Sequence, residues 1–87
     1  MIQRPFVTIN MEATGKNIQA LRKKNHYTVK DLQEYFGFEY PQAIYKWQWG
    51  QCLPTIDNLV GLSILFHVSI NDILVVNNED IVFCGAA

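Results

Sequence analysis

Two glycines and a proline in one short stretch limit how this chain can fold. Gly37 directly follows the apolar residue Phe36, at a position where a helix commonly ends with a residue of positive φ. Pro41 suits the first position of a helix because its missing N–H has no intrahelical partner there. Gly50 supplies a C-terminal stop. The stretch therefore predicts the end of one helix, a tight turn, and a short helix over 41–49.

The short helix has two chemically different sides. Ala43, Ile44 and Trp47 can share one helical face, which is expected to be buried. Amide, phenol, ammonium and indole groups on the opposite side suit base edges, base methyls and phosphates. An ordinary amphipathic surface helix explains the same periodicity, so the pattern alone leaves both interpretations open. The residues of this outer side are Gln42, Tyr45, Lys46 and Trp49.

Two helices are predicted before this stretch. Asn10 can cap the first, within which Gly15 costs roughly 1 kcal/mol relative to alanine. The basic cluster 22–24 falls in its last turn, where cations meet the negative end of the helix dipole, and it could also contact a DNA backbone. Thr28 and Asp31 have the spacing of a capping box. The helix that they begin has free N–H groups that, with Thr28, could hold a phosphate.

Two helices are also predicted after this stretch. Thr55 caps the fourth helix, which is apolar nearly all round to Phe66 and is therefore expected to be the central core element. His67 stands where a left-handed residue is common, which indicates a structural role. Ser69 and Asp72 form a cap for a fifth helix.

The ends of the chain differ from its centre. The segments 5–9 and 81–83 are short and apolar, and could form strands that pair with each other or across a dimer. We therefore expect an all-α, compact five-helix fold with short terminal β-strands. Its divisions are an N-terminal extension or strand at 1–10, a helical domain at 11–76, and a C-terminal tail with a short strand at 77–87.

The charge of the chain is polarised although its net value is only −1. Residues 1–46 hold all seven basic and four acidic residues, which gives +3, whereas residues 47–87 hold four acidic residues, which gives −4. Such a molecule could turn its basic part toward phosphates. Chance asymmetry in a small chain explains the distribution equally well.

Several function classes find no support in the sequence. It has no nucleophile–base set and no phosphate-cradling glycine loop, so no enzyme, cofactor or small-molecule substrate is expected. The cysteines and histidines lack zinc-ligand spacing. The sequence has no long apolar run and no signal peptide, so no membrane partner is expected. The two cysteines are far apart in the sequence and need not form a disulfide. Reduced thiols are typical of a cytoplasmic protein, which is the location that we expect. The two histidines and two cysteines considered as zinc ligands are His26, His67, Cys52 and Cys84.

A set of motifs spread over about residues 13–75 is specific as a group. It comprises Ile18-x-x-Leu21-Arg22, Phe36-Gly37, Ile44-x-x-Trp47-x-x-Gly50, Leu53-Pro54, Leu59-x-x-Leu62 and Val68-Ser69-x-x-Asp72. This set resembles the Cro/repressor-type (xenobiotic-response-element type) helix-turn-helix family, and in particular its small single-domain bacterial regulators. The resemblance implies that the second and third helices form the helix-turn-helix and that the third lies in the major groove.

The resemblance also implies partners and contact residues. It predicts a dimeric, sequence-specific regulator of transcription, a repressor, bound to double-stranded DNA. Candidate base contacts are Gln42, Tyr45 and Lys46. Candidate backbone contacts are Thr28, Gln33, Tyr40, Trp49 and Gln51. Candidate residues for a homodimer surface at the termini are Phe6, Ile9, Val82 and Phe83.

The chain departs from the family pattern in three ways that bear on function. Gln33 stands where many members have a small alanine, so its side chain must either point to solvent or join the DNA contacts. The turn before the third helix is one residue longer than usual, which shifts the side chains that lead this helix. Trp49 stands where arginine or asparagine is frequent, which lowers the positive charge of the face. The aromatic residues Tyr40, Tyr45 and Trp49 therefore also fit an alternative, a protein-interaction or antitoxin-like module on the same fold.

Overall fold

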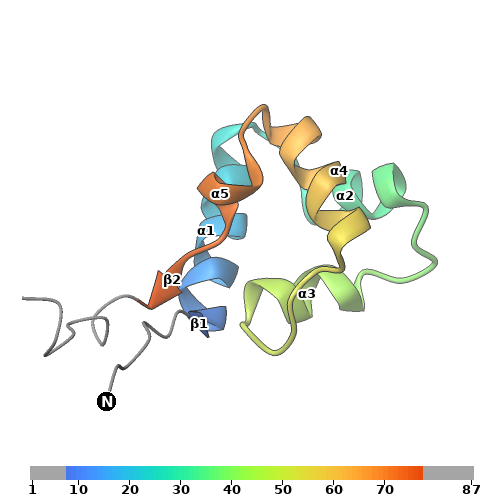
Figure 1. The fold of residues 1–87 in the computed structure, drawn as a ribbon. Helices are drawn as coiled ribbons and strands as arrows, with labels where there is room; N and C mark the ends of the chain where they lie inside the picture. The colour runs from blue at the N-terminus through green and yellow to red at the C-terminus, as the bar shows by residue number, and fades with distance from the viewer. Residues whose placement is uncertain (1–7, 78–87) are drawn as a thin grey trace, which may run out of the picture.

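The computed structural model describes residues 8–77 (Figure 1), which form five helices and two short strands. The predicted all-α, five-helix architecture is confirmed. The expected strand at 81–83 and the first part of the one at 5–9 lie outside the described residues. The elements are β1 (Thr8–Ile9), α1 (Met11–Lys24), α2 (Val29–Phe36), α3 (Gln42–Gln48), α4 (Ile56–Phe66), α5 (Ile70–Ile73) and β2 (Val76–Asn77).

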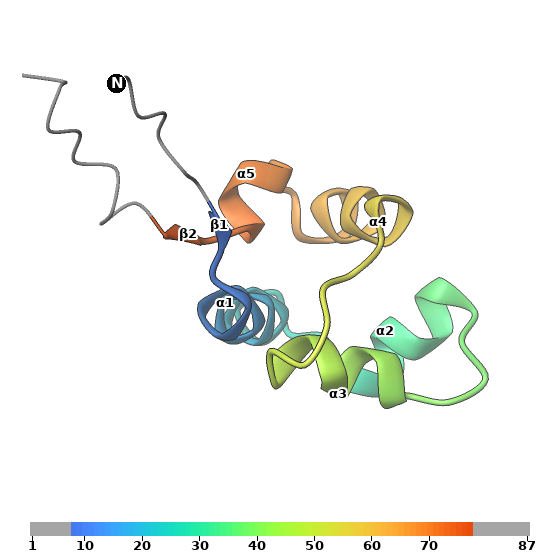
Figure 2. The same ribbon diagram turned by 60° about the horizontal axis from the view of Figure 1, so that its bottom comes forward.

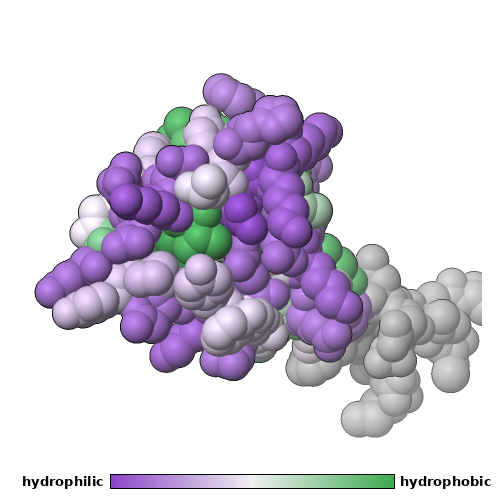
Figure 3. Space-filling model, turned by 180° about the vertical axis from the view of Figure 1, so that it is seen from behind, coloured by the Kyte–Doolittle hydropathy of each residue, from purple (hydrophilic) through white to green (hydrophobic). Residues whose placement is uncertain are grey.

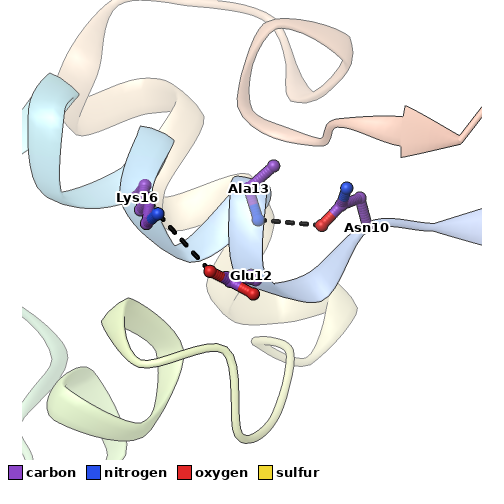
Figure 4. A network of polar contacts seen from close by, with 4 residues as sticks. All are labelled: Asn10, Glu12, Ala13 and Lys16. Carbon is purple, nitrogen blue, oxygen red and sulfur yellow. Dashed lines mark hydrogen bonds and ion pairs between the residues drawn. The ribbon is translucent and has the colours of Figure 1, made fainter.

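Side-chain caps explain where the helices begin. Asn10 accepts a hydrogen bond from the backbone N–H of Ala13 at 2.9 Å, which starts α1 (Figure 4). The Thr28 hydroxyl accepts from the Asp31 N–H at 3.0 Å, and the Asp31 carboxylate accepts from the Thr28 N–H at 2.8 Å. This is the capping box predicted for α2. The caps predicted at Thr55 and Ser69 are likewise confirmed.

Left-handed residues explain where three segments turn. Gly37 ends α2 with a φ of 70°, and Gly50 follows α3 with a φ of 74°. His67 ends α4 with a φ of 57°, as its position in the sequence predicted. The bounds of α3 differ by one residue at each end from the expected 41–49, because Pro41 caps the helix from outside and Trp49 closes it.

A polar seam joins α1 to the far end of the described chain. The buried hydroxyl of Thr14 accepts from the Val75 N–H at 2.9 Å and donates to the Val75 carbonyl at 3.4 Å. The Asn17 amide donates to the Asp72 carbonyl at 2.7 Å and to the Ile73 carbonyl at 2.9 Å. These bonds hold the chain where β1 and β2 pair antiparallel, with Thr8 opposite Asn77 and Ile9 opposite Val76.

The core is lined by one face of each helix, and α4 contributes only one of its sides. Ile56 is 73% exposed and Ile64 is 62% exposed, whereas Leu62 on the opposite side is fully buried. The helix expected to be the central core element contributes Leu59, Leu62 and Phe66 to the core, but from one face only, because the other helices cover a single face of it. The buried apolar residues are Ile18, Leu32, Ile44, Trp47, Leu59, Leu62, Phe66 and Ile73.

Candidate functional site

The inner face of α3 is fixed by aromatic packing. Trp47 is buried, and its ring centroid lies 5.6 Å from that of Phe36 and 5.9 Å from that of Phe38, both edge-on. Ile44, one turn earlier, is fully buried. The burial predicted for this face is confirmed for Ile44 and Trp47, whereas Ala43 is half-buried. The orientation of α3 is therefore set by the core, and its outer face is left free for another role.

Glycine allows α1 to lie directly against the end of α3. A Cβ on Gly15 would stand 2.3 Å from the Trp47 carbonyl oxygen and 2.7 Å from that of Gln48. A Cβ on Gly50 would stand 2.8 Å from the Cα of Glu12. Any larger residue would collide with backbone, which cannot rotate away as a side chain can. The close approach is a second restraint on α3.

A buried polar contact provides a third restraint, which the sequence analysis did not anticipate. Gln48 is only 8% exposed, and its Oε1 accepts from Arg22 Nε at 2.9 Å. Arg22 Nη1 also donates to the Tyr27 carbonyl at 2.8 Å. Arg22 therefore braces α3 from inside the fold. A glutamine next to the buried Trp47 was the available signal, since its side chain needs a partner when buried.

The outer face of α3 presents four exposed side chains along one side of the helix. In Figure 2, α3 lies along the lower edge of the domain with α2 beside it and α4 and α5 above. The predicted exposure of the four is confirmed. The Tyr45 and Trp49 rings are stacked, with centroids 5.6 Å apart and planes 23° apart. The four residues, called the α3 row below, are Gln42, Tyr45, Lys46 and Trp49.

The turn before α3 is held by its own hydrogen bonds. The Phe38 N–H donates to the Gln33 carbonyl at 3.0 Å, and the Gln33 side-chain amide donates to the Glu39 carbonyl at 3.1 Å. Gln33 therefore spans the longer turn instead of pointing simply to solvent. Tyr40, within the turn, is exposed. The turn is thus held by hydrogen bonds and presents an aromatic side chain next to α3.

The remaining sequence-predicted contact residues belong to two other segments. Thr28 caps α2, so its hydroxyl oxygen already accepts a bond and only its proton is left to donate to a phosphate. Asp31 places a carboxylate at the same helix end. Gln51 is exposed after α3, and its N–H donates to the Lys46 carbonyl at 2.9 Å.

Cations around the site come from three helices. Lys46 is the one basic residue of α3, and Lys30 is exposed on α2. Lys16 on α1 pairs with Glu12 at 3.4 Å (Figure 4), with both side chains mostly exposed. The face viewed from behind in Figure 3 is largely hydrophilic, and its hydrophobic side chains form only small separate patches.

A second exposed surface lies on α4. Ile56, Val60 and Ile64 recur every four residues and are all exposed, which places them along one side of the helix. Tyr35 of α2 lies next to this row, since its hydroxyl donates to the Gly61 carbonyl at 3.4 Å. We call these three aliphatic residues the α4 stripe. The sequence did not single it out, because burial would produce the same apolar pattern.

Two absences hold for the described part of the chain. Within residues 8–77, no group of three or more histidine, cysteine, aspartate or glutamate side chains is placed to hold a metal ion. No helix in the same range combines the length and apolar character needed to cross a bilayer.

Comparison with known proteins bears on the fold. No protein-family model matches the sequence, and a search of curated proteins gave no match. Among solved structures, the crystal structure of the DNA-binding domain of BldD is similar, with a TM-score of 0.62 and 15% sequence identity. The match covers 75% of this chain and 93% of that chain. The chain therefore shares the helix-turn-helix fold of that domain.

Proposed function

We propose that this protein is a sequence-specific DNA-binding regulator of transcription, a repressor, that places α3 in the major groove. The observation that carries the proposal is the α3 row: four exposed side chains on a short helix whose opposite face is fixed by Trp47, Gly15 and Gln48. A rigid support lets side chains meet base edges in a constant register. The similarity in fold to a DNA-binding domain supports the same conclusion.

Each member of the row has a chemical role in this proposal. Gln42 can bond bidentately to an adenine edge, and Lys46 can donate to guanine acceptors. Tyr45 lies between them on the same face and completes the base-reading set. Polar and aromatic groups around the helix supply contacts to the DNA backbone. These are Thr28, Gln33, Tyr40, Trp49 and Gln51.

In this proposal the protein acts as a homodimer in the bacterial cytoplasm. Two copies of α3 about 34 Å apart would read two half-sites one duplex turn apart. Of the residues that the sequence indicated for the dimer surface, Ile9 is half-buried at the β1–β2 pair, and Phe6, Val82 and Phe83 lie outside the described residues. The exposed α4 stripe is the better candidate, because identical uncharged apolar rows are complementary to each other.

Selection of binding sites from a random DNA pool tests the proposal. We expect enrichment of an inverted repeat, and an affinity that falls steeply as salt concentration rises. Lys46→Ala should lower the affinity by a factor that corresponds to about 1–3 kcal/mol and relax the selected sequence at one position. Lys16→Ala removes the same charge from α1 and serves as the control. A folded wild-type protein that enriches no sequence would contradict the proposal.

A second candidate function is a protein-interaction module of antitoxin-like type on the same fold. The specific observation that favours it is the α4 stripe, because Ile56 and Ile64 expose apolar surface that cannot bond to a base. Selection from the DNA pool separates the two candidates, because a pure interaction module enriches no sequence, whereas either candidate could use the α4 stripe for assembly. Ile64→Glu should abolish self-association or partner binding through α4, whereas Asn71→Glu on α5 adds the same charge elsewhere. Light scattering of both variants gives the mass.

A further inference from the structure

We infer that the α3 row reads the C5-methyl group of thymine through Tyr45, with Trp49 as the residue that positions the Tyr45 ring. The preferred DNA is therefore an A·T-containing site. This inference rests on the proposed function, because it names the base chemistry that α3 would recognise. It begins from the stacked Tyr45–Trp49 pair on the outer face of the helix.

The polar members of the row can read both purines. Arginine and lysine are the usual partners of guanine, and α3 has one lysine and no arginine. Lys46 is its one basic residue, and Gln42 has the amide that pairs with the N6 and N7 atoms of adenine. An adenine brings a thymine opposite it, and the methyl group of that thymine projects into the same groove.

The spacing of the row places Tyr45 near such a methyl group. Gln42 and Tyr45 are three residues apart, which is a rise of about 4.5 Å along a helix. Residues three apart lie on the same face of a helix. Tyr45 is therefore placed beside Gln42, where it can meet the methyl group of the thymine paired with that adenine.

The stack makes Tyr45 suitable for an apolar contact. The Tyr45 ring centroid lies 5.6 Å from that of Trp49, and the two ring planes are nearly parallel. Because the stack already restricts the Tyr45 ring, the ring loses less conformational entropy when it binds DNA. Trp49 is 63% exposed and follows the last residue of α3, further along the helix than Tyr45. We therefore assign Trp49 to positioning and the methyl contact to Tyr45.

Replacement of thymine by uracil provides the test, because it removes the methyl group and keeps the base pair. The selected site is resynthesised with uracil at one thymine at a time. We expect one or two positions per half-site at which affinity falls about fourfold, the effect of one buried methyl group. All other positions should change little.

Variants assign the effect to its residue. Tyr45→Ala should weaken binding to the thymine site and remove the difference between thymine and uracil, whereas Tyr45→Phe should keep it because the ring remains. Trp49→Ala should reduce the difference and Trp49→Phe should retain most of it. Lys46→Ala is the control: affinity for both DNAs should fall by the same factor. Thermal unfolding of each variant shows that it is folded.

The outcomes separate this inference from the proposed function. If the wild-type protein selects a site but uracil has no effect at any position, the thymine contact is overturned and DNA binding stands. A difference between thymine and uracil that survives in Tyr45→Ala also overturns the assignment. If the folded protein selects no DNA, the proposed function fails and the inference fails with it; the aromatic pair would then be sought at a protein interface.

Discussion

The outer faces of α3 and α4 are both exposed, yet they differ in composition and in support. The α3 row combines hydrogen-bonding groups with a stacked aromatic pair, and backbone, aromatic rings and a buried amide hold it from behind. The α4 stripe is purely aliphatic on a helix packed on one side. Base edges need hydrogen bonds in a fixed register, whereas an aliphatic row gains only from removal from water. Exposure alone therefore does not define a functional surface.

The largest expected contrast comes from one substitution made on both helices. Ile44→Ala removes a fully buried side chain and should lower the free energy of unfolding by about 2–5 kcal/mol. Ile64→Ala removes a side chain that is exposed in the single chain and should change the free energy of unfolding by less than about 0.5 kcal/mol at protein concentrations too low for dimerisation. Urea denaturation measures both. A large loss for Ile64→Ala would mean that the α4 stripe is already covered in solution.

Two helical glycines give the next contrast. Gly15→Ala places a Cβ against two backbone carbonyls of α3 and should destabilise the fold by about 1–3 kcal/mol, despite the higher helix propensity of alanine. Gly61→Ala on α4 meets the ring of Phe36, which can shift, so it should cost less. Denaturation of both variants provides the measurement. An unchanged or higher stability of Gly15→Ala would show that α1 and α3 are not in close contact.

Two glutamines of α3 separate support from recognition. Gln48→Ala leaves Arg22 without its buried partner and should lower the free energy of unfolding by about 1–3 kcal/mol. Gln42→Ala should leave stability within about 0.5 kcal/mol of the wild type and weaken binding to the selected DNA. Denaturation and DNA titration are needed for both. Equal effects on stability would remove the distinction between the two faces of α3.

The smallest effect is expected on α1. Lys16→Ala breaks the exposed pair with Glu12 and should change the free energy of unfolding by less than about 0.5 kcal/mol. It should also lower DNA affinity less than Lys46→Ala does. Titrations at two salt concentrations check this. Equal losses for the two lysines would indicate that general charge, and not the α3 row, accounts for binding.

Sequence reasoning succeeded where local chemistry decides structure. The caps at Asn10, Thr28 and Ser69 and the left-handed turns at Gly37 and His67 depend on residues close in the chain. They are confirmed. The two faces of α3 were also predictable. Pro41 and Gly50 mark the two ends of this helix, and within these limits the apolar residues recur at helical spacing.

Sequence reasoning failed where distant segments decide. The exposure of Ile64 depends on how much of α4 the other helices can cover, and an apolar pattern does not report this. The bond between Arg22 and Gln48 joins residues 26 positions apart. Gly15 was predicted only to weaken a helix, whereas its contact with α3 follows from packing. The DNA contacts of the α3 row stay predictions.

The pairing of Thr8 with Asn77 has a consequence for chain connectivity. Because the two ends of the described domain lie side by side, a short linker could join them, and the chain could be opened elsewhere without separating any packed elements. The bond between Tyr40 and Pro41 is one place for new ends, because Phe38 and Glu39 then stay attached to α2. A circular permutant opened there would keep α3 and its support but would free the chain immediately before α3. Comparison of such a permutant with the native order would reveal whether DNA reading needs the covalent α2–α3 turn or only the packing of the two helices.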